Sequence, residues 1–327
     1  METAAELDPL RASAGAGDPA AMTALGRLLL IGKDGPFEPQ EGLAMIRRAA
    51  DGGEPEALAQ LAVLHAGGAW TPQDWTAGLD CLQRAAELGH QAARSQLELI
   101  AADPSLPASA PLEDGADRWR RLRERIDIEA WTRPPERRAV CENPRIRVVE
   151  RFAAPEVCRW LIERSRGKLK PARMFDGTQA NPLETRTCSD YIFDITEADL
   201  VLLLVRERAS RLTKLPTATM EPPQIFHYAV GQEIKAHFDH VRAEGGYQGE
   251  RIATFLLYLN DDYEGGDLTF PRAGFSWKGR TGDAIFFANV DLAGKADRMS
   301  LHAATPVTRG EKYMFSQWIQ DRPVGSA

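Results

Sequence analysis

Two histidines and one aspartate, His237, Asp239 and His302, are the residues of this 327-residue sequence whose types and spacing could do chemistry. Successive side chains of an extended strand alternate between its faces, so His237 and Asp239 would point to the same side. A second imidazole from a distant strand, that of His302, would complete a set of two histidines and one carboxylate. Such a set occupies one face of an octahedron, leaves the opposite face open, and suggests non-haem iron(II).

The elements around these residues decide how the pattern is interpreted, because a His-x-Asp run occurs often by chance. Short runs rich in β-branched and aromatic residues follow Asp239, separated by glycine, proline, asparagine and aspartate. They are residues 251–259, 268–271 and 282–287. Their spacing predicts an antiparallel sandwich or barrel, in which strands far apart in the sequence can lie side by side.

Several motifs occur in a fixed order through this region. They are YAVGQEIKAHFD at residues 228–239, YLND at 258–261, EGG at 264–266, and LHAATPVTRGEK at 301–312 running on to Trp318. With these motifs, the stretch from about Asn143 to Asp321 resembles the catalytic domain of prolyl 4-hydroxylases. Members of that family are dioxygenases that depend on iron(II) and 2-oxoglutarate and have a double-stranded β-helix, or jelly-roll, core.

The resemblance implies a complete set of site residues and cofactors. It implies that His237, Asp239 and His302 ligate Fe(2+). It also implies that Lys312 and Tyr228 hold the far carboxylate of 2-oxoglutarate, and Trp318 stands where the family has a tryptophan lining the same pocket. The implied partners are dioxygen and a protein or peptide substrate, with L-ascorbate (vitamin C) as an additional cofactor.

The chemistry of the co-substrate supports the role of Lys312 independently. A dicarboxylate that chelates iron through one end needs a cation for its other end, which a lysine ammonium can supply. If residues 311–320 form a strand, alternate side chains share a face. These are Lys312, Met314, Ser316 and Trp318. Arg309 is the nearest competitor, but the adjacent Gly310 predicts a turn, so we rank Arg309 second.

One position departs from the family pattern. Where the family commonly has Gly-Gly-Glu-Thr-x-Phe-Pro, residues 265–271 read Gly-Gly-Asp-Leu-Thr-Phe-Pro. Leu268 therefore replaces a hydroxyl in the co-substrate pocket. We expect the contacts of the co-substrate to differ at this position.

The composition is that of an ordinary globular protein. The formal net charge of −7 gives no overall basic character, which argues against nucleic acid as the main partner. No apolar stretch is long enough to span a bilayer, and the first residues lack the pattern of a secretory signal. Four cysteines without tight spacing predict reduced thiols, and together these features favour a cytoplasmic location. They are Cys81, Cys141, Cys158 and Cys188.

The N-terminal part of the chain contains an internal repeat with a period of 36 residues. The recurring segments are GDPAA at residues 17–21, GEPEA at 53–57 and GHQAA at 89–93. This period predicts helix-turn-helix units stacked into a solenoid, and the pattern resembles Sel1-like repeats, relatives of the tetratricopeptide repeats, over about residues 11–102. Because repeat surfaces are generally binding surfaces, we expect this one to bind a protein partner or the oxygenase domain itself. The alternative is that the three repeats only stabilise the chain.

The predicted fold class is multidomain α + β. An α-helical solenoid at residues 1–102 precedes a linker and connecting helix at 103–142, and a jelly-roll oxygenase domain with flanking helices spans 143–327. In the connection, the proline- and serine-rich residues 103–111 predict an extended linker, and 114–131 predict one helix.

Three elements are predicted to flank the jelly roll. Residues 146–152 favour a strand, and the apolar positions after Pro155 favour a helix that begins there. A second amphipathic helix over residues 197–212 is expected to pack against the outside of the sheet.

The favoured function is hydroxylation of a protein or peptide side chain, with proline as the target, coupled to decarboxylation of 2-oxoglutarate to succinate and CO2. One alternative is a repeat-based binding or scaffold protein whose jelly roll is inactive. Another is a zinc hydrolase with the same three ligands, which leaves the pairing of Lys312 with Trp318 unexplained. Succinate formation with iron, and none with zinc, separates the three.

Overall fold

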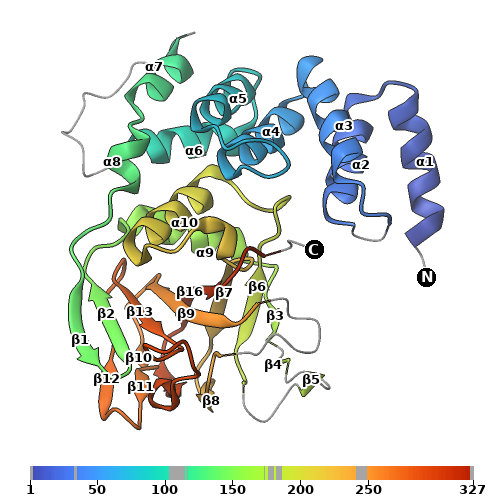
Figure 1. The fold of residues 1–327 in the computed structure, drawn as a ribbon. Coiled ribbons are helices and arrows are strands. Elements are labelled where there is room, and N and C mark those ends of the chain that lie inside the picture. Colours follow the sequence, from blue (N-terminus) through green and yellow to red (C-terminus); the bar gives the residue numbers. More distant parts are fainter. Residues whose placement is uncertain are drawn as a thin grey trace. The chain divides into compact units, whose positions relative to one another are not determined.

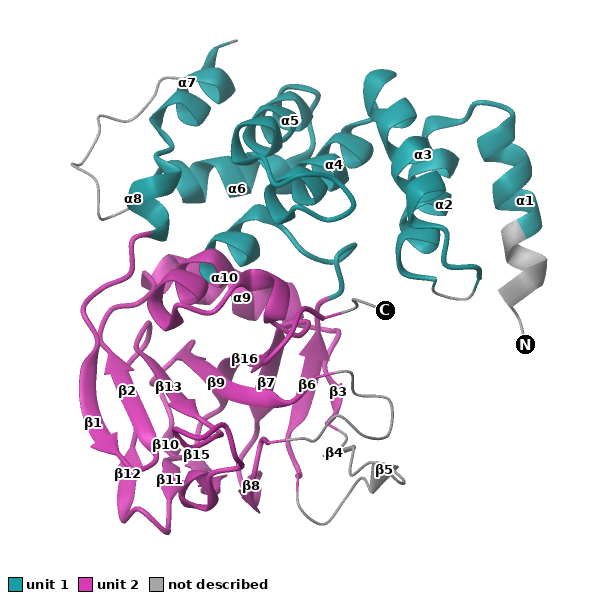
Figure 2. Ribbon diagram, in the orientation of Figure 1, with its two compact units in different colours: residues 1–132, 194–205 teal, residues 133–193, 206–327 magenta. Residues whose placement is uncertain are grey.

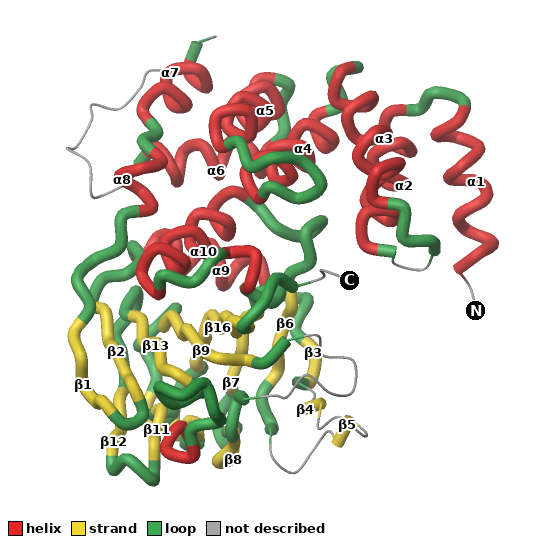
Figure 3. The backbone as a smooth tube through the Cα atoms, viewed as in Figure 1, coloured by secondary structure: helices red, strands yellow, loops and turns green. Residues whose placement is uncertain are grey.

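A computed structural model describes residues 3–32, 35–102, 115, 117–172, 174–175, 180–181, 186–240 and 249–324. The chain forms two compact units (Figure 2). Unit 1 comprises residues 1–132 and 194–205, and unit 2 comprises residues 133–193 and 206–327. Figure 3 shows that helices predominate in unit 1 and strands in unit 2. Within the described ranges, no helix has the length and apolar character needed to cross a membrane.

Unit 1 is built from pairs of helices, which confirms the predicted solenoid (Figure 1). The helices are α1 (Thr3–Gly15), α2 (Pro19–Ile31), α3 (Pro39–Asp51), α4 (Pro55–Gly67), α5 (Trp75–Glu87) and α6 (Gln91–Ala101). The repeated glycines Gly17, Gly53 and Gly89 all have positive φ, so each ends one helix in a conformation that other residues adopt at a cost. Leucines that recur with the same 36-residue period are buried and contribute to the core of the repeats. They are Leu25, Leu61 and Leu97.

The connection after the repeats differs from its prediction. The proposed linker at residues 103–111 lies outside the described residues. The single helix predicted for 114–131 is wrong: the described part contains α7 (Arg118–Arg125) and α8 (Ile128–Thr132). The break occurs because the Asp127 carboxylate accepts a hydrogen bond from the backbone N–H of Ala130 at 3.0 Å, which starts a new helix.

A short segment from the second half of the sequence belongs to unit 1. It covers residues 194–205 and includes the first part of α10 (Leu200–Thr213). Gln60 and Gln96, which occupy equivalent positions one repeat apart, hydrogen-bond the backbone of this segment: the Gln60 amide donates to Ile195 O at 3.2 Å, and Gln96 Oε1 accepts from Leu200 N at 3.0 Å.

The helix predicted at residues 197–212 starts later than the prediction. The Asp199 side chain accepts from Leu202 N at 2.8 Å and sets the start of α10 at Leu200. Its first part, Leu200–Val205, belongs to the same unit as the repeats. The α10 residue Leu203 packs close to Gly67 of α4. A Cβ atom added to Gly67 would lie 3.6 Å from the Leu203 side chain.

Unit 2 contains α9 (Pro155–Ser165), the rest of α10, and antiparallel sheets. The larger sheet has eight strands in the order β1-β2-β13-β9-β16-β7-β6-β3. Their bounds are β1 (Arg138–Glu142), β2 (Arg145–Val149), β13 (Ala284–Ala288), β9 (Arg251–Tyr258), β16 (Lys312–Gln320), β7 (Gln224–Tyr228), β6 (Ser189–Ile192) and β3 (Lys170–Pro171). The predicted strand at residues 146–152 is β2, and the helix predicted after Pro155 is α9.

A second, four-stranded sheet has the order β12-β11-β14-β8. Its strands are β12 (Phe275–Trp277), β11 (Leu268–Phe270), β14 (His302–Ala304) and β8 (Ile234–His237). Two short pairs join β10 (Glu264–Gly265) to β15 (Val307–Arg309) and β4 (Met174–Phe175) to β5 (Ala180–Asn181), and two 3-10 turns cover Thr217–Thr219 and Arg298–Ser300. Side chains from both large sheets, among them Phe226, Tyr258, Phe270 and Phe287, form one buried core. The predicted jelly-roll architecture with flanking helices is confirmed.

Candidate functional site

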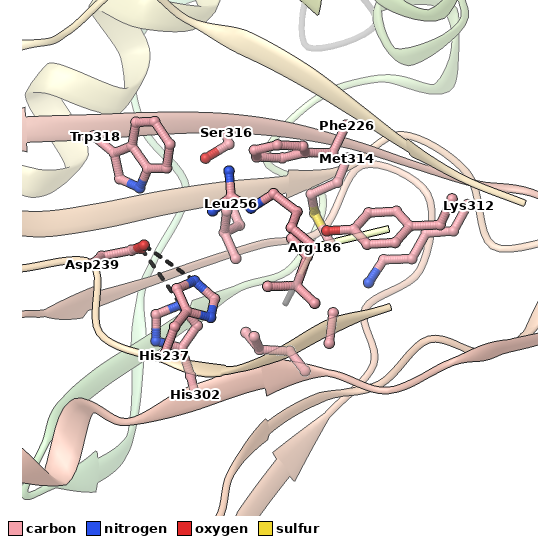
Figure 4. A pocket seen from close by; sticks show the side chains of 14 residues that line it. Arg186, Phe226, His237, Asp239, Leu256, His302, Lys312, Met314, Ser316 and Trp318 are labelled. Atoms are coloured by element: carbon pink, nitrogen blue, oxygen red, sulfur yellow. Dashed lines mark ion pairs between the residues drawn. The ribbon is translucent and has the colours of Figure 1, made fainter. Parts of the chain in front are cut away.

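The three candidate metal ligands come together at the edge of the smaller sheet. Strands β8 and β14 are paired so that His237 lies opposite His302, and their ring centroids are 4.3 Å apart. Asp239 follows just beyond the end of β8 and directs its buried carboxylate at both rings (Figure 4). One ligating atom from each residue lies within 4.8 Å of the others.

Backbone carbonyls fix the direction of both imidazoles. The Nδ1 atom of His237 lies 2.9 Å from Lys235 O, and Nδ1 of His302 lies 2.9 Å from Ser300 O. A carbonyl oxygen can only accept, so each Nδ1 carries the proton and each Nε2 presents a lone pair. This arrangement, in which the second ring nitrogen is held by a protein acceptor, is typical of histidines that ligate metals.

The distances within the triad fit a cation better than a direct ion pair. Nε2 of His237 lies 3.4 Å from Asp239 Oδ1, and Nε2 of His302 lies 3.5 Å from Asp239 Oδ2. Charge-assisted hydrogen bonds between such groups are shorter, at about 2.7–2.9 Å. Two imidazoles and one carboxylate separated in this way match the donor set of a 2-His-1-carboxylate iron site.

The protonation states agree with this donor set. Burial and the neighbouring His302 lower the pKa of His237, which keeps its imidazole neutral. Burial alone would raise the pKa of the Asp239 carboxyl, but the His302 and His237 side chains oppose that effect and hold the pKa well below its usual value. The site therefore offers a negatively charged carboxylate at Asp239 and a neutral imidazole at His237.

The triad lies in a pocket formed by side chains of both large sheets. The pocket is lined by Arg186, Phe226, Tyr228, Ile234, His237, Asp239, Leu256, Leu268, His302, Ala304, Lys312, Met314, Ser316 and Trp318. Strand β16 contributes Lys312, Met314, Ser316 and Trp318, so the predicted alternation along that strand is confirmed. The departure at Leu268 also falls in the pocket, as expected.

Lys312 is buried in the same pocket as the triad. Its side chain is 1% exposed, and Nζ donates a hydrogen bond to Gly266 O at 2.6 Å. The same Nζ lies 5.0 Å from the ring centroid of Tyr228 and 5.5 Å from that of Tyr258. A buried ammonium with one hydrogen-bonded proton and aromatic surroundings retains donors for an anionic ligand. In Figure 4, Lys312 and the triad occupy separated parts of one pocket, as the two ends of a dicarboxylate require.

Arg309, the competitor of Lys312, lies outside the pocket, as do two other histidines of this unit. Arg309 has a 77% exposed side chain and pairs with Glu264 at 2.6 Å. His240 lies near Glu250 at 3.5 Å, and His227 stacks on Tyr313 with ring centroids 4.7 Å apart. None of these residues lines the pocket around the triad.

Sequence reasoning missed one charged residue of the pocket. Arg186 reaches it through an isolated β-bridge to Ile234, and its guanidinium carbon lies 5.1 Å from the Phe226 ring centroid and 5.9 Å from that of Trp318. The Arg186 Nε atom is buried and has no hydrogen-bond partner among the described residues. No local pattern marks Arg186, because only the pairing of distant strands brings it to the site.

The Lys312 pKa leads to a testable pH dependence. Burial lowers the pKa of Lys312 to about 7, and a bound carboxylate would raise it by favouring the charged form. Binding of 2-oxoglutarate should then take up a proton, so its dissociation constant should rise by up to about tenfold per pH unit above about pH 7. Calorimetric titrations over this range, in buffers of different ionisation enthalpy, measure both quantities. A Lys312→Arg variant, whose side chain stays charged, should lose this pH dependence.

Comparisons with known proteins agree with the geometry. A family described as the 2OG-Fe(II) oxygenase superfamily matches residues 223–320. "Probable prolyl 4-hydroxylase 9" of Arabidopsis thaliana is 34% identical over 201 residues, which cover 55% of this chain and 70% of that protein. "Prolyl 4-hydroxylase 13" of the same organism is 32% identical over 199 residues, covering 55% of this chain and 72% of that protein.

A solved structure also resembles part of the chain. It is the 2OG complex of the viral collagen prolyl hydroxylase vCPH from Paramecium Bursaria Chlorella virus-1, with 24% identity, coverage of 55% of this chain and 98% of that chain, and a TM-score of 0.45. The sequence identity to the Arabidopsis relatives extends over more than two thirds of their length. The chain therefore belongs to the prolyl 4-hydroxylase family, and it is an iron(II)- and 2-oxoglutarate-dependent dioxygenase.

Proposed function

We propose that His237, Asp239 and His302 ligate the catalytic iron and that Lys312, Tyr228 and Trp318 hold 2-oxoglutarate. One observation carries this assignment: a buried triad of the right donor types shares a single pocket with a buried lysine. When bound, iron(II) and 2-oxoglutarate supply the oxidising chemistry, in which dioxygen decarboxylates the co-substrate to succinate and CO2 and places one oxygen atom on the substrate.

The chain's own residues position the reactants. Two imidazoles fixed by backbone carbonyls and one carboxylate would hold the metal from one side, which would leave room for the co-substrate and dioxygen. Lys312 neutralises the far carboxylate of the co-substrate, and the apolar side chains of Leu256, Leu268 and Met314 exclude water around its carbon chain.

We infer that the substrate is a prolyl residue in a protein or peptide. The support is the family membership, since the Arabidopsis relatives are named prolyl 4-hydroxylases. The test is mass spectrometry of cell extract and of proline-containing peptides incubated with enzyme, iron and 2-oxoglutarate. Addition of oxygen mass to a proline supports the assignment, and modification confined to other residue types rejects proline as the target.

We also propose a cytoplasmic location and L-ascorbate as an additional reductant. The support for the location is that Cys81, Cys141, Cys158 and Cys188 are all free thiols, as is usual in reducing compartments. Ascorbate would keep the iron reduced, so its addition should slow the loss of activity over successive turnovers.

The predicted modules have separate roles in this proposal. Residues 143–327 carry the oxygenase site, residues 103–142 connect, and the repeats at residues 1–102 recruit the protein substrate. Phe37 supports recruitment: its side chain is 64% exposed, and its ring packs edge-on against Trp70 with centroids 6.5 Å apart. Exposed aromatic side chains are enriched at interfaces between proteins.

Recruitment predicts that Phe37→Ser raises the KM for the protein substrate by about tenfold, which corresponds to about 1.4 kcal/mol of lost binding. The KM for a short peptide carrying the same target residue should not change, because the peptide needs only the pocket. Leu88→Ser is the matched control. Leu88 is another exposed apolar residue of the repeats, at 52% exposure, but it is not aromatic. Equal effects on protein and peptide substrates would contradict recruitment.

Removing residues 1–102 altogether is a less specific test. It would take away the Gln60 and Gln96 side chains that hold the backbone of residues 195–200. The buried Leu200 and Leu202 would lose their surroundings in unit 1 as well. We therefore expect the truncated protein to lose solubility, together with its activity on both protein and peptide substrates.

A further inference from the structure

A buried chain of hydrogen bonds runs from the candidate iron ligand Asp239 into the larger sheet. The Thr254 hydroxyl donates to Asp239 Oδ2 at 2.7 Å, and the Asn289 side-chain amide donates to Thr254 Oγ1 at 3.0 Å. Thr254 is 1% exposed and Asn289 is fully buried. Because both side chains are buried, water cannot replace either hydrogen bond without entering the core.

The backbone holds both residues in fixed positions. Thr254 lies in the middle of β9, opposite Phe287 of β13 on one side and Trp318 of β16 on the other. Asn289 directly follows β13, and its backbone N–H donates to Ile252 O at 2.8 Å. Because Thr254 is held between two neighbouring strands, it can act as a fixed support for the buried Asp239, which lies just beyond the end of β8.

The direction of the hydrogen bonds follows from what each group can donate. A carboxylate only accepts, so the single hydroxyl proton of Thr254 must point to Asp239. Thr254 Oγ1 then has only lone pairs left for Asn289, and the amide must present its N–H. This orientation leaves Asn289 Oδ1 without a hydrogen-bond partner among the described residues. The reverse orientation would draw the hydroxyl proton away from the carboxylate.

We propose that Thr254 and Asn289 are positioning residues that hold the Asp239 carboxylate in the orientation needed to bind iron. This inference rests on the proposed ligand set. Asp239 Oδ2 accepts the hydrogen bond from Thr254 at 2.7 Å and also lies 3.5 Å from His302 Nε2, while Oδ1 lies 3.4 Å from His237 Nε2. The hydrogen bond therefore fixes the carboxylate with its oxygens toward the imidazoles.

The position of the carboxylate matters because Asp239 supplies the one anionic donor among the three proposed ligands. Without the Thr254 hydroxyl, the carboxylate would be free to rotate away from the imidazoles. Asn289 keeps that hydroxyl turned toward Asp239.

The test measures metal binding in the full-length protein without turnover. Thr254→Val has nearly the same shape but no hydroxyl, and anaerobic titration should show Fe(II) affinity reduced on the order of 10- to 100-fold. Thr254→Ser restores the hydroxyl and should restore affinity. Asn289→Ala should weaken binding in the same direction, because it releases the Thr254 hydroxyl. Substitution of Co(II) for iron adds a spectroscopic measurement, since its visible bands report a change in coordination number.

The control is Thr219→Val, which removes another buried threonine hydroxyl. Thr219 Oγ1 donates to Pro216 O at 2.8 Å and makes no contact with the triad. If Thr254→Val binds iron as tightly as Thr219→Val does, or if Thr254→Ser fails to restore binding, the inference is wrong. Should Thr254→Val fail to fold, Asn289→Ala decides, because wild-type metal affinity and Co(II) spectra in that variant overturn the proposal.

Asp239→Ala separates this inference from the proposed ligand set. Loss of iron binding in Asp239→Ala with normal binding in Thr254→Val rejects only the positioning role. Normal iron binding in Asp239→Ala rejects the ligand set itself.

Discussion

Replacing any one of His237, Asp239 and His302 with alanine is expected to abolish turnover of 2-oxoglutarate. Each change removes one of three donors whose ligating atoms lie within 4.8 Å of one another, and an iron site with two protein ligands binds weakly. Succinate release, measured with saturating iron and co-substrate, should fall to background in all three variants. The fold should persist, because the surrounding core of aromatic and aliphatic side chains is unchanged.

His240→Ala is the matched control for the triad. His240 follows Asp239 directly, yet it lies near Glu250 and does not line the pocket. Its variant should retain activity. Full activity in any one of the three triad variants would reject the ligand set, and succinate formation that persists with zinc in place of iron would reject the redox mechanism.

Replacing Lys312 with alanine is expected to weaken binding of 2-oxoglutarate by about 2–5 kcal/mol, which is about 30-fold to about 5,000-fold. The loss is large because the far carboxylate of the co-substrate would be buried without a cation. Iron should still bind, since Lys312 is not one of the three candidate iron ligands. Anaerobic titration of the iron-loaded protein with 2-oxoglutarate measures the affinity directly.

Arg309→Ala provides the comparison for Lys312. Arg309 is exposed and pairs with Glu264, so its removal should change co-substrate affinity by less than about 1 kcal/mol. If Arg309→Ala needed far more 2-oxoglutarate than Lys312→Ala, the two residues would have to exchange roles.

Local periodicity determined the parts of this protein that were predictable from the sequence. The two-residue alternation of β16 placed Lys312, Met314, Ser316 and Trp318 on one face, because successive side chains of a strand must point to opposite sides. The 36-residue repeat predicted the helical pairs, because glycines at a fixed spacing end each helix and leucines at a fixed spacing pack the next.

Tertiary structure decided what depends on partners far away in the chain. Asp127 divides a helix that the sequence pattern continued, and residues 194–205 join the unit that contains the repeats. Arg186 enters the pocket through a bridge to Ile234. None of these features leaves a period in the sequence, because each depends on one specific contact.

The sequence identified part of the candidate site, and the tertiary structure identified the rest. The spacing of His237 and Asp239, together with the later His302 motif, was enough to predict an iron site and its donor types. The sequence could not show that Thr254 and Asn289 support Asp239, because threonine and asparagine occur in many strands and turns without such a role. The pairing of β9 with β13 brings Asn289 close to Thr254, and the packing of β9 against the other sheet brings the Thr254 hydroxyl to the Asp239 carboxylate.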